Sequence, residues 1–388
     1  MTVMSLGDVV GRLYRAVRLT LPRPLRFALD GTRARLFGTA YLMRHFDLTV
    51  GLVRRRLQPR RLFVGWVLHG DEDDGGSRLH ALLPHRYLRR RGINSVILRR
   101  PRQHGSGYRP RPEDIERVLR AGFDVVAFQE VHGPDIEAWV RALRGVGTRT
   151  VYVTGDLHGT GMAAVVDRVV ASSAGLTGIA EGYMEKTRVI EASIETPPSL
   201  VKDYSRRPAG GEIRVVWVGY PENVHLLGPV REALEDPRLT RFRLITISRG
   251  PEATYQWDRR RVSRQLLDCD IGVLPSAATD WYQAKPNTRM TMFKALGIPV
   301  VASPIQSYAD TLTHGRSCYF ARTVTDWAEC LLALADPERR RDMGLADRVR
   351  ILAAYGFDTI GERWLSLFED LCGQGVSRER SHGSVRDH

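Results

Sequence analysis

Short apolar runs alternate with amphipathic stretches along most of the chain, and this alternation limits what the chain can fold into. The first apolar run covers residues 62–70 (LFVGWVLHG), and residues 79–92 (LHALLPHRYLRRRG) then show a helical period that ends in glycine. The runs NSVILR, DVVAFQ and RTVYVTG follow, separated by further helical patterns. Strands that alternate with helices form a parallel sheet covered on both faces, so the sequence predicts an α/β fold.

A second series of the same kind begins after a break. Prolines and glycines mark a linker at residues 195–211, and the runs EIRVVWVG, RFRLITISRG, DIGVLPS and PVVASP then alternate with helical patterns. A chain of 388 residues is also too long for one ordinary core. We expect two Rossmann-like domains, at 61–200 and 212–370, facing one another across a cleft. A basic helical segment at 1–60 and a disordered tail at 373–388 would flank them.

Positive charge is concentrated near the N-terminus. Residues 1–61 hold thirteen Arg and three Asp, a surplus of +10 within a formal net charge of +14. The arginines of this segment are interspersed with apolar residues. The segment could therefore contact an anionic membrane or nucleic-acid phosphates, or it could be a basic helical face exposed to solvent. Nucleic acid is the least expected partner, because the surplus lies outside the two predicted domains.

Other features indicate a cytoplasmic protein, with peripheral membrane contact through residues 1–60. No apolar run reaches about 18 residues, and the N-terminus lacks the order of a secretory signal. The four cysteines show no C-x-x-C pairing, which indicates neither disulfides nor a metal site. The acidic run DEDD at residues 71–74 is read as a loop, so no metal ion is expected.

The stretch AKPNTRMTMFKAL offers a place for an anion. In open parallel sheets, ligands bind beyond the carboxyl ends of the strands. Lys285 comes just before a predicted helix and Arg289 lies in its first turn, so positive charge and free backbone N–H groups coincide. One cation at about 4 Å, at an effective dielectric near 20, contributes about 4 kcal/mol to binding a phosphate charge. A pair of solvated charges is the alternative, although lysine occurs at only four positions in the chain.

With these motifs in order, residues 213 to 368 resemble the C-terminal domain of retaining GT-B glycosyltransferases (glycosyl transferases group 1, family 4-like). The resemblance rests on DIGVLPS, AKPNTR, FKALGIPVVASP and LLALADPERRRDMG, and less specifically on GGSRLHALLPHRYLRRRGI and DRVVASSAGLT in the first half. One departure is clear. Where many family members carry two glutamates eight positions apart, this chain has Ala284 and Met292.

The resemblance implies a GT-B fold and transfer of a sugar, a hexose or related, from a nucleotide diphosphate sugar to an acceptor hydroxyl with retention. The product would belong to glycan, glycolipid or natural-product biosynthesis, and no metal would be needed. Lys285 and Arg289 would stabilise the departing diphosphate, while Asp156 and His158 would contact the acceptor or the donor sugar.

The remaining candidates follow the other strands. Donor-binding candidates are Gly219, Asn223, Arg249, Ser276, Trp281 and Asn287. Acceptor-side candidates are Gly75, Gly76, Gln129, Glu130 and His132.

Two alternatives stay open. The missing glutamates favour a catalytically inactive GT-B-like protein that binds without turnover. Another GT-B enzyme, such as a nucleotide-sugar epimerase or a phosphorylase, is the second alternative, and the lack of a recognisable catalytic acid set argues against it.

Overall fold

The chain divides into two compact units, residues 1–57 and 58–388. The computed structural model describes residues 39–59, 61–99, 108–156, 159–180, 184–205 and 211–373. In the first unit it describes α3 (Thr39–Leu57), which ends with Arg54, Arg55 and Arg56. This helix lies within the predicted basic segment, whereas residues 1–38 and the predicted tail from 374 onward lie outside the described residues. No helix of the described residues is long and apolar enough to cross a membrane.

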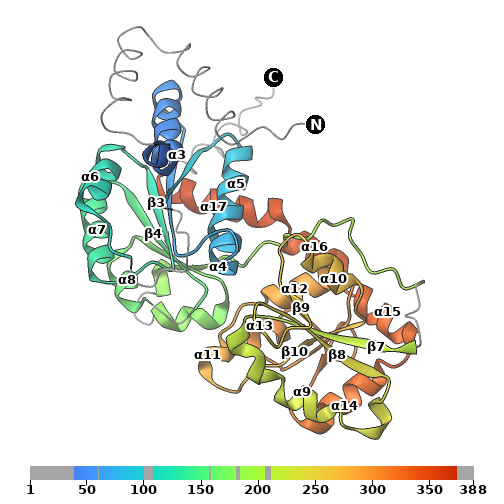
Figure 1. Ribbon diagram of the computed structural model, residues 1–388. Coiled ribbons are helices and arrows are strands. Elements are labelled where there is room, and N and C mark those ends of the chain that lie inside the picture. The colour runs from blue at the N-terminus through green and yellow to red at the C-terminus, as the bar shows by residue number, and fades with distance from the viewer. Residues whose placement is uncertain are drawn as a thin grey trace, which may run out of the picture. The chain divides into compact units, whose positions relative to one another are not determined.

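Two parallel six-stranded sheets form the second unit, in the orders β2-β1-β3-β4-β5-β6 and β12-β11-β10-β7-β8-β9 (Figure 1). Every strand pairing within them is parallel, as the alternation of strands and helices predicts. The strands are β1 (Phe63–Leu68), β2 (Asn94–Arg99), β3 (Val125–Gln129), β4 (Arg149–Thr154), β5 (Arg168–Ala171), β6 (Thr187–Val189), β7 (Ile213–Val218), β8 (Phe242–Ser248), β9 (Tyr255–Gln256), β10 (Ile271–Leu274), β11 (Val300–Ala302) and β12 (Tyr319–Phe320). The sequence analysis did not identify four of these strands, β5, β6, β9 and β12, of which β9 and β12 are only two residues long.

Helices cover both faces of the first sheet. The first-half helices are α4 (Gly75–Ser77), the π-helical segment η1 (Arg78–Leu82), α5 (Leu83–Arg90), α6 (Pro112–Arg120), α7 (Pro134–Gly145), α8 (Thr160–Val165), and the 3-10 segments η2 (Ala174–Ala180) and η3 (Met184–Lys186). On one face, α7 places Trp139 edge-on against Phe128 of β3, with ring centroids 5.4 Å apart. On the other face, α5 contributes Tyr87 and Leu88 to the core.

The second sheet is covered in the same way. Its helical elements are η5 (Pro221–Leu227), α9 (Gly228–Ala233), η6 (Pro237–Leu239), α10 (Val262–Leu267), α11 (Asp280–Gln283), α12 (Thr288–Ala295), α13 (Gln306–Ala309), α14 (Val324–Ala333), α15 (Pro337–Leu345), α16 (Arg348–Ala354) and α17 (Phe357–Leu371). Residues of α9 and α14 pack on one face, while residues of α10 and α12 pack on the other.

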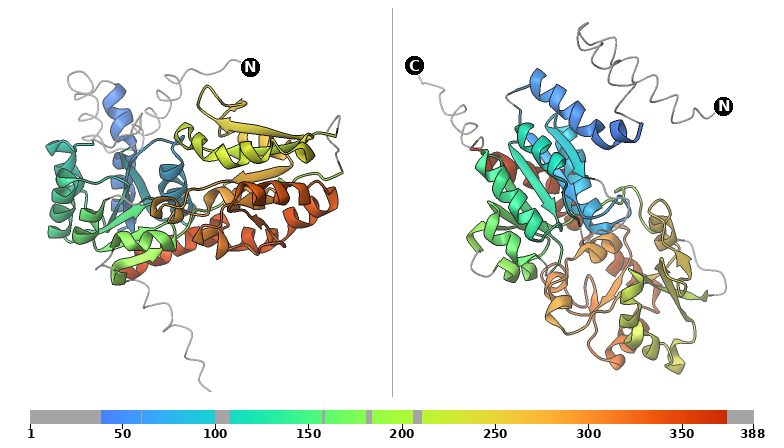
Figure 2. Two further views of the ribbon diagram at one scale, coloured as in Figure 1. Left: turned by 90° about the horizontal axis from the view of Figure 1, so that it is seen from below. Right: turned by 60° about the vertical axis from the view of Figure 1, so that its left-hand side comes forward.

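The last helix, α17, returns to the first half (Figures 1 and 2). Its Trp364 and Phe368 lie with Trp66 of β1 in one hydrophobic core. The ring centroids of Trp66 and Trp364 are 5.5 Å apart in an edge-on arrangement. All but the last residue of α17 falls inside the predicted 212–370 domain, but its apolar side chains pack in the core of the first half, so the two halves share this helix.

Lys294 of α12 is fully buried and joins this helix to its neighbours. Its ammonium donates hydrogen bonds to the carbonyls of Ser317 (3.1 Å), Met343 (2.5 Å) and Gly344 (3.1 Å). Burial lowers the pKa of this lysine to about 8. The three bonds satisfy a charge that would otherwise be costly in the core, and they hold α12, which follows the predicted anion site, against the segment around α15.

We expect Lys294→Met to destabilise the protein by about 1–3 kcal/mol, because it leaves buried carbonyls without donors. The folded pKa near 8 lies below the ordinary lysine pKa of 10.5, so the unfolded chain holds this proton over a range where the folded chain has lost it. Lys294 therefore contributes more to stability as the pH rises from 8 to 10.5, and the deficit of the variant grows over that range. Urea unfolding at pH 7.5 and pH 9.5 measures both effects, with Lys186→Met as control. A deficit that shrinks with pH would contradict the assignment.

Candidate functional site

Lys285 and Asp156 connect the two halves at the carboxyl ends of their sheets. Asp156 follows β4, and Lys285 lies between α11 and α12. The Lys285 Nζ atom donates to Asp156 Oδ2 at 2.7 Å, with side chains 25% and 23% exposed. The ammonium also lies 4.1 Å from the centroid of the Trp281 ring. The structure thus brings together Asp156 and two residues of the loop before α12, Trp281 and Lys285, all selected by the sequence analysis, and Lys285 is not a solvated charge.

Arg289 is also anchored. Burial raises the pKa of the Tyr308 hydroxyl, and the charge and hydrogen bond of Arg289 act in the opposite direction. The guanidinium therefore contacts this buried tyrosine of α13. His158, the remaining predicted catalytic residue, lies outside the described residues.

Asn287 precedes the first residue of α12 and is 4% exposed. Its Nδ2 atom donates to Thr311 Oγ1 at 3.4 Å, a long contact. Its Oδ1 atom is buried and has no hydrogen-bond partner among the described residues. The predicted contact of Asn287 with a donor stays a prediction, and the side chain does not cap α12.

Ala284 is packed where many relatives of the resembled family carry a glutamate. The Ser173 hydroxyl donates to the Ala284 carbonyl at 2.6 Å, and Ala284 is 5% exposed. A Cβ atom added to Gly175 would lie 2.8 Å from the Ala284 Cα atom, so the two backbones meet closely. Met292 packs against the core of the second half. The side chains at both positions therefore pack against neighbouring residues, and the larger side chain of a glutamate at position 284 would clash with the backbone around Gly175.

Glu130 follows β3 and has a left-handed backbone conformation, with φ 51°. Its Oε1 accepts the Gly155 N–H at 2.9 Å, and its Oε2 accepts from Gln129 Nε2 at 2.9 Å. The pKa of Glu130 is raised to about 7, mainly by burial and also by the charges of Asp74 and Asp156, while the two hydrogen bonds act in the opposite direction. A carboxyl that titrates near neutrality has the pKa that a general base needs.

The other acceptor-side candidates have different surroundings. Gln129 is fully buried, and its Oε1 accepts from Ser77 Oγ at 2.6 Å and from the His69 N–H at 3.2 Å, so it holds the turn before α4. A Cβ atom added to Gly76 would lie 3.0 Å from Glu130 Oε2, so this glycine lies against the carboxylate. His132 is exposed.

His80 is a residue that the sequence analysis missed. It is 4% exposed, and burial lowers its pKa to about 4, while the charge of Asp74 opposes this shift. The imidazole is therefore neutral at physiological pH. A histidine inside an apolar helical pattern gives no signal that would separate it from a core residue.

The donor-side candidates lie at the carboxyl ends of the second sheet. Asn223 Oδ1 accepts from the Tyr282 hydroxyl at 3.2 Å, which ties η5 to α11. The Gly219 N–H donates to the Ile247 carbonyl at 3.2 Å. The Ser276 N–H donates to Ser303 Oγ at 3.0 Å, so its backbone helps to order the loop after β10.

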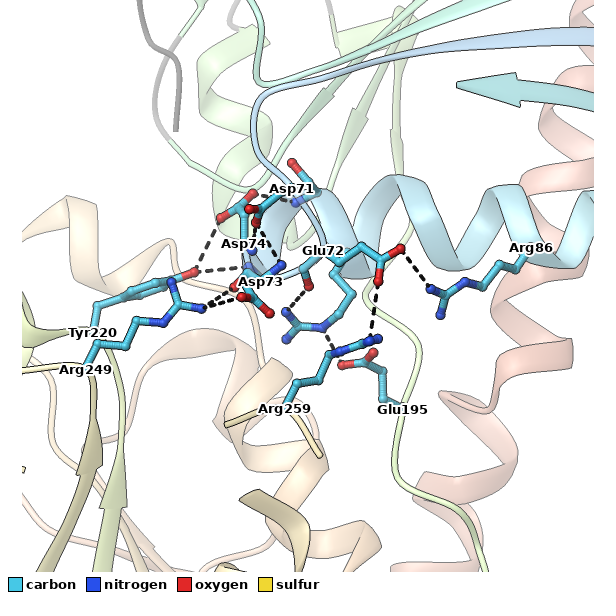
Figure 3. A network of polar contacts seen from close by, with 12 residues as sticks. Asp71, Glu72, Asp73, Asp74, Arg86, Glu195, Tyr220, Arg249 and Arg259 are labelled. Atoms are coloured by element: carbon cyan, nitrogen blue, oxygen red, sulfur yellow. Dashed lines mark hydrogen bonds and ion pairs between the residues drawn. The ribbon is translucent and has the colours of Figure 1, made fainter. Parts of the chain in front are cut away.

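Arg249 contacts the acidic loop of the first half (Figure 3). Its Nη2 donates to the Asp73 carbonyl at 3.0 Å. Two further residues of the second half reach the same loop, Tyr220 and Arg259, and the sequence analysis missed both. Tyr220 could have been found from its place directly after Gly219 at the end of a strand. Arg259 has no such signal in an Arg-rich chain.

Within the described part of the chain, no group of three or more His, Cys, Asp or Glu side chains is placed to hold a metal ion. The expectation that no metal is needed stays a prediction.

Replacing Glu130 by glutamine tests the environment of this carboxyl. Because the folded pKa is near 7 and the ordinary glutamate pKa is 4.5, the unfolded chain loses this proton first as the pH rises. Ionisation therefore reduces wild-type stability between pH 4.5 and 7, and Glu130→Gln escapes this loss. We expect the variant to gain about 1–3 kcal/mol relative to wild type across this range, measured by urea unfolding. Glu116→Gln on exposed α6 is the control, and parallel stability curves for wild type and Glu130→Gln would refute the prediction.

Restoring a glutamate at position 284 tests the packing. We expect Ala284→Glu to destabilise the protein by about 1–3 kcal/mol through overpacking against Gly175, and further through burial of a carboxyl group. Ala278→Glu, at an exposed position of the same loop, should change stability little. Thermal unfolding of both variants gives the comparison, and an Ala284→Glu variant as stable as Ala278→Glu would show that the site can open.

The comparisons with known proteins agree with this architecture. Residues 219–366 match the model of a protein family described as glycosyl transferase-like. HepE of Anabaena, in complex with UDP and glucose, aligns with a TM-score of 0.60 at 11% identity, over 80% of this chain and 100% of its own. A glycosyltransferase from Rickettsia africae aligns with a TM-score of 0.61 at 12% identity, over 80% and 99%. No curated protein matches the chain.

At these identities the structural matches establish the fold alone, while the family match covers most of the second half. The chain therefore has the GT-B fold, and residues 219–366 of its second half are similar to the glycosyl transferase-like family.

Proposed function

We propose that the protein transfers a sugar from a nucleoside diphosphate sugar to an acceptor hydroxyl. The observation that carries this proposal is the contact of Lys285 with Asp156, because it places a cation of the glycosyl transferase-like half against the strand ends of the other half. A donor bound at the second half would have its leaving group near Lys285, and its sugar would face the first half.

Lys285 and Arg289 would stabilise the leaving diphosphate. Lys285 precedes α12 and Arg289 lies in its first turn, where the positive end of the helix dipole adds to their charge. Removing one preorganised donor of this kind typically costs about 2.7–4 kcal/mol of transition-state stabilisation. While no donor is bound, Asp156 holds the Lys285 ammonium in place, and the Trp281 ring supports it from a second side.

A uridine diphosphate hexose is the first donor to test, since HepE forms complexes with UDP and with UDP-glucose. Asn223, Ser276, Asn287 and Gly219 would surround the nucleotide. Glu130 and Asp156 would face the acceptor, and Glu130 titrates in the range where it could take the acceptor proton. Retention at the anomeric carbon and activity without metal belong to the same proposal, as the resemblance implies.

The acceptor would be a glycan, a glycolipid or a natural product. Arg54, Arg55 and Arg56 at the end of α3, with the exposed side chains of Val53 and Leu57, suit contact with an anionic membrane surface. We propose a cytoplasmic protein that makes peripheral contact of this kind.

A binding protein without turnover is the second candidate. The observation in its favour is that Ala284 and Met292 are packed apolar positions, so neither supplies a carboxylate to a donor. Turnover separates the candidates, because an inactive protein would bind a nucleotide sugar and release no free sugar or glycoside from it.

Thermal shifts with a panel of nucleoside diphosphates and nucleotide sugars test the donor site. A ligand at 100 times its dissociation constant stabilises a protein by about 2.7 kcal/mol, which gives a clear rise in Tm. We expect a shift with one base, and we expect Lys285→Ala combined with Arg289→Ala to abolish it, because both diphosphate cations are gone.

The matched control removes one lysine and one arginine elsewhere. Lys186→Ala with Arg243→Ala changes the same charge at η3 and on β8, away from the proposed donor site. This control should keep the shift. Loss of the shift in both double variants would point to net charge rather than to a site, and no shift in wild type with any nucleotide would remove the proposed function.

A further inference from the structure

The acidic turn, defined here as Asp71–Gly75, is bound to three residues of the second half (Figure 3). Tyr220, Arg249 and Arg259 reach it from the loops after β7, β8 and β9. The contacts join two residues that the sequence analysis selected, the donor-binding candidate Arg249 and the acceptor-side candidate Gly75.

Arg249 is engaged on two sides. Its Nη2 atom donates to the Asp73 carbonyl at 3.0 Å and lies 3.9 Å from the Asp73 carboxylate. The guanidinium also lies over the Trp257 ring, 4.6 Å from its centroid. A planar guanidinium stacked on an aromatic ring keeps its orientation, so its N–H groups remain directed at the turn.

The other face of the acidic turn is held by the first half itself. Arg78 donates to the Glu72 carbonyl at 3.0 Å, forms an ion pair with Glu195 at 2.6 Å, and lies 5.5 Å from the Trp257 ring centroid. The Glu72 carboxylate lies 3.4 Å from Arg259. The turn is therefore placed against the second half by charges and hydrogen bonds rather than by apolar packing.

Tyr220 completes the arrangement. Its hydroxyl accepts the Gly75 N–H at 3.1 Å and is 3.4 Å from Asp74 Oδ1, to which it donates. The residue is 43% exposed, so its position is set by these polar contacts more than by burial. The Gly75 N–H and the Nη2 group of Arg249, both suited to phosphate oxygens, thus donate to groups of the protein.

We infer that Tyr220 and the acidic turn keep the donor site in a self-paired state, in which protein groups occupy the positions of the phosphate oxygens. To bind, a nucleoside diphosphate must displace the Tyr220 hydroxyl from the Gly75 N–H and Asp73 from Arg249. The inference rests on the proposed function and adds to it a residue, Tyr220, that sets donor affinity. A diphosphate and the acidic turn compete for the same cation, because two anions cannot share it without repulsion. The apparent dissociation constant is the intrinsic one divided by the fraction of molecules in which the site is released.

Two variants weaken the self-paired state, one in the second half and one in the acidic turn. Tyr220→Phe removes the hydroxyl that bonds Gly75 and Asp74, and Glu72→Gln removes the charge that pairs with Arg259. If the site is released in a tenth of the wild-type molecules, full release lowers the dissociation constant about tenfold. We expect each variant to bind UDP about three- to tenfold more tightly in isothermal titration calorimetry, within that limit.

The controls change the same groups outside this network. Tyr255→Phe and Glu235→Gln, both at exposed positions of the second half, should leave the UDP dissociation constant unchanged. Equal affinity of wild type and both test variants, or weaker binding by them, would overturn the inference while leaving the donor site in place. If UDP and the other nucleoside diphosphates bind to none of the proteins, the proposed function fails and the displacement fails with it.

Hydrogen–deuterium exchange gives a readout that needs no nucleotide. The Gly75 amide donates to Tyr220, so Tyr220→Phe should speed exchange in a peptide that covers residues 70–78 of the ligand-free protein, and Tyr255→Phe should not. Saturating UDP should speed exchange at residues 71–74 of wild type as the acidic turn is displaced. Exchange that Tyr220→Phe leaves unaltered would refute the self-paired state whatever the nucleotide results.

Discussion

Backbone pairing between parallel strands is the constraint on which the rest of this structure depends. Each six-stranded sheet is buried on both faces, which requires helices on both sides and therefore a long connection after every strand. Because all strands run the same way, their carboxyl ends lie along one edge of each sheet, and the loops after β1, β3, β4, β7, β8 and β10 collect there. The candidate site residues come from these loops, because parallel pairing puts the loops that follow the strands together at one edge of each sheet.

The two halves are joined by more than the linker. Helix α17 packs its Trp364 and Phe368 beside Trp66, so the end of the chain stabilises the half that begins it. Lys285–Asp156 and Ser173–Ala284 then connect the loops of the two halves directly. The apolar contact is extensive and buried, whereas the loop contacts are polar. The Lys285–Asp156 pair among them is partly exposed, and exposed ion pairs contribute only about 0–1 kcal/mol each. A ligand that supplies better partners can therefore rearrange the loops while α17 stays packed.

Much of the fold can be predicted from the sequence, because buried parallel strands appear as apolar runs such as FVGWVL and the helices between them keep their period. The strands β9 and β12 are too short to give a run of this kind. The return of α17 to the first half could not be predicted either, since its apolar side would suit the core of either half. At the site, Lys285, Asp156 and Trp281 could be selected individually as polar or aromatic residues after strands, but not their mutual contact. His80, Tyr220 and Arg259 depend on tertiary placement that periodicity does not contain.

The two lysines of AKPNTRMTMFKAL show why residue type alone does not assign a role. Lys294 is buried, bonded to three carbonyls, and has a lowered pKa, so its charge is used within the fold. Lys285 is nine positions earlier, partly exposed, and paired with one carboxylate of the opposite half. A cation held by a single exchangeable partner can be passed to an incoming anion, whereas one enclosed by backbone carbonyls cannot. The difference comes from the surroundings of each side chain, because backbone carbonyls of the core surround Lys294, whereas loops of the two halves surround Lys285.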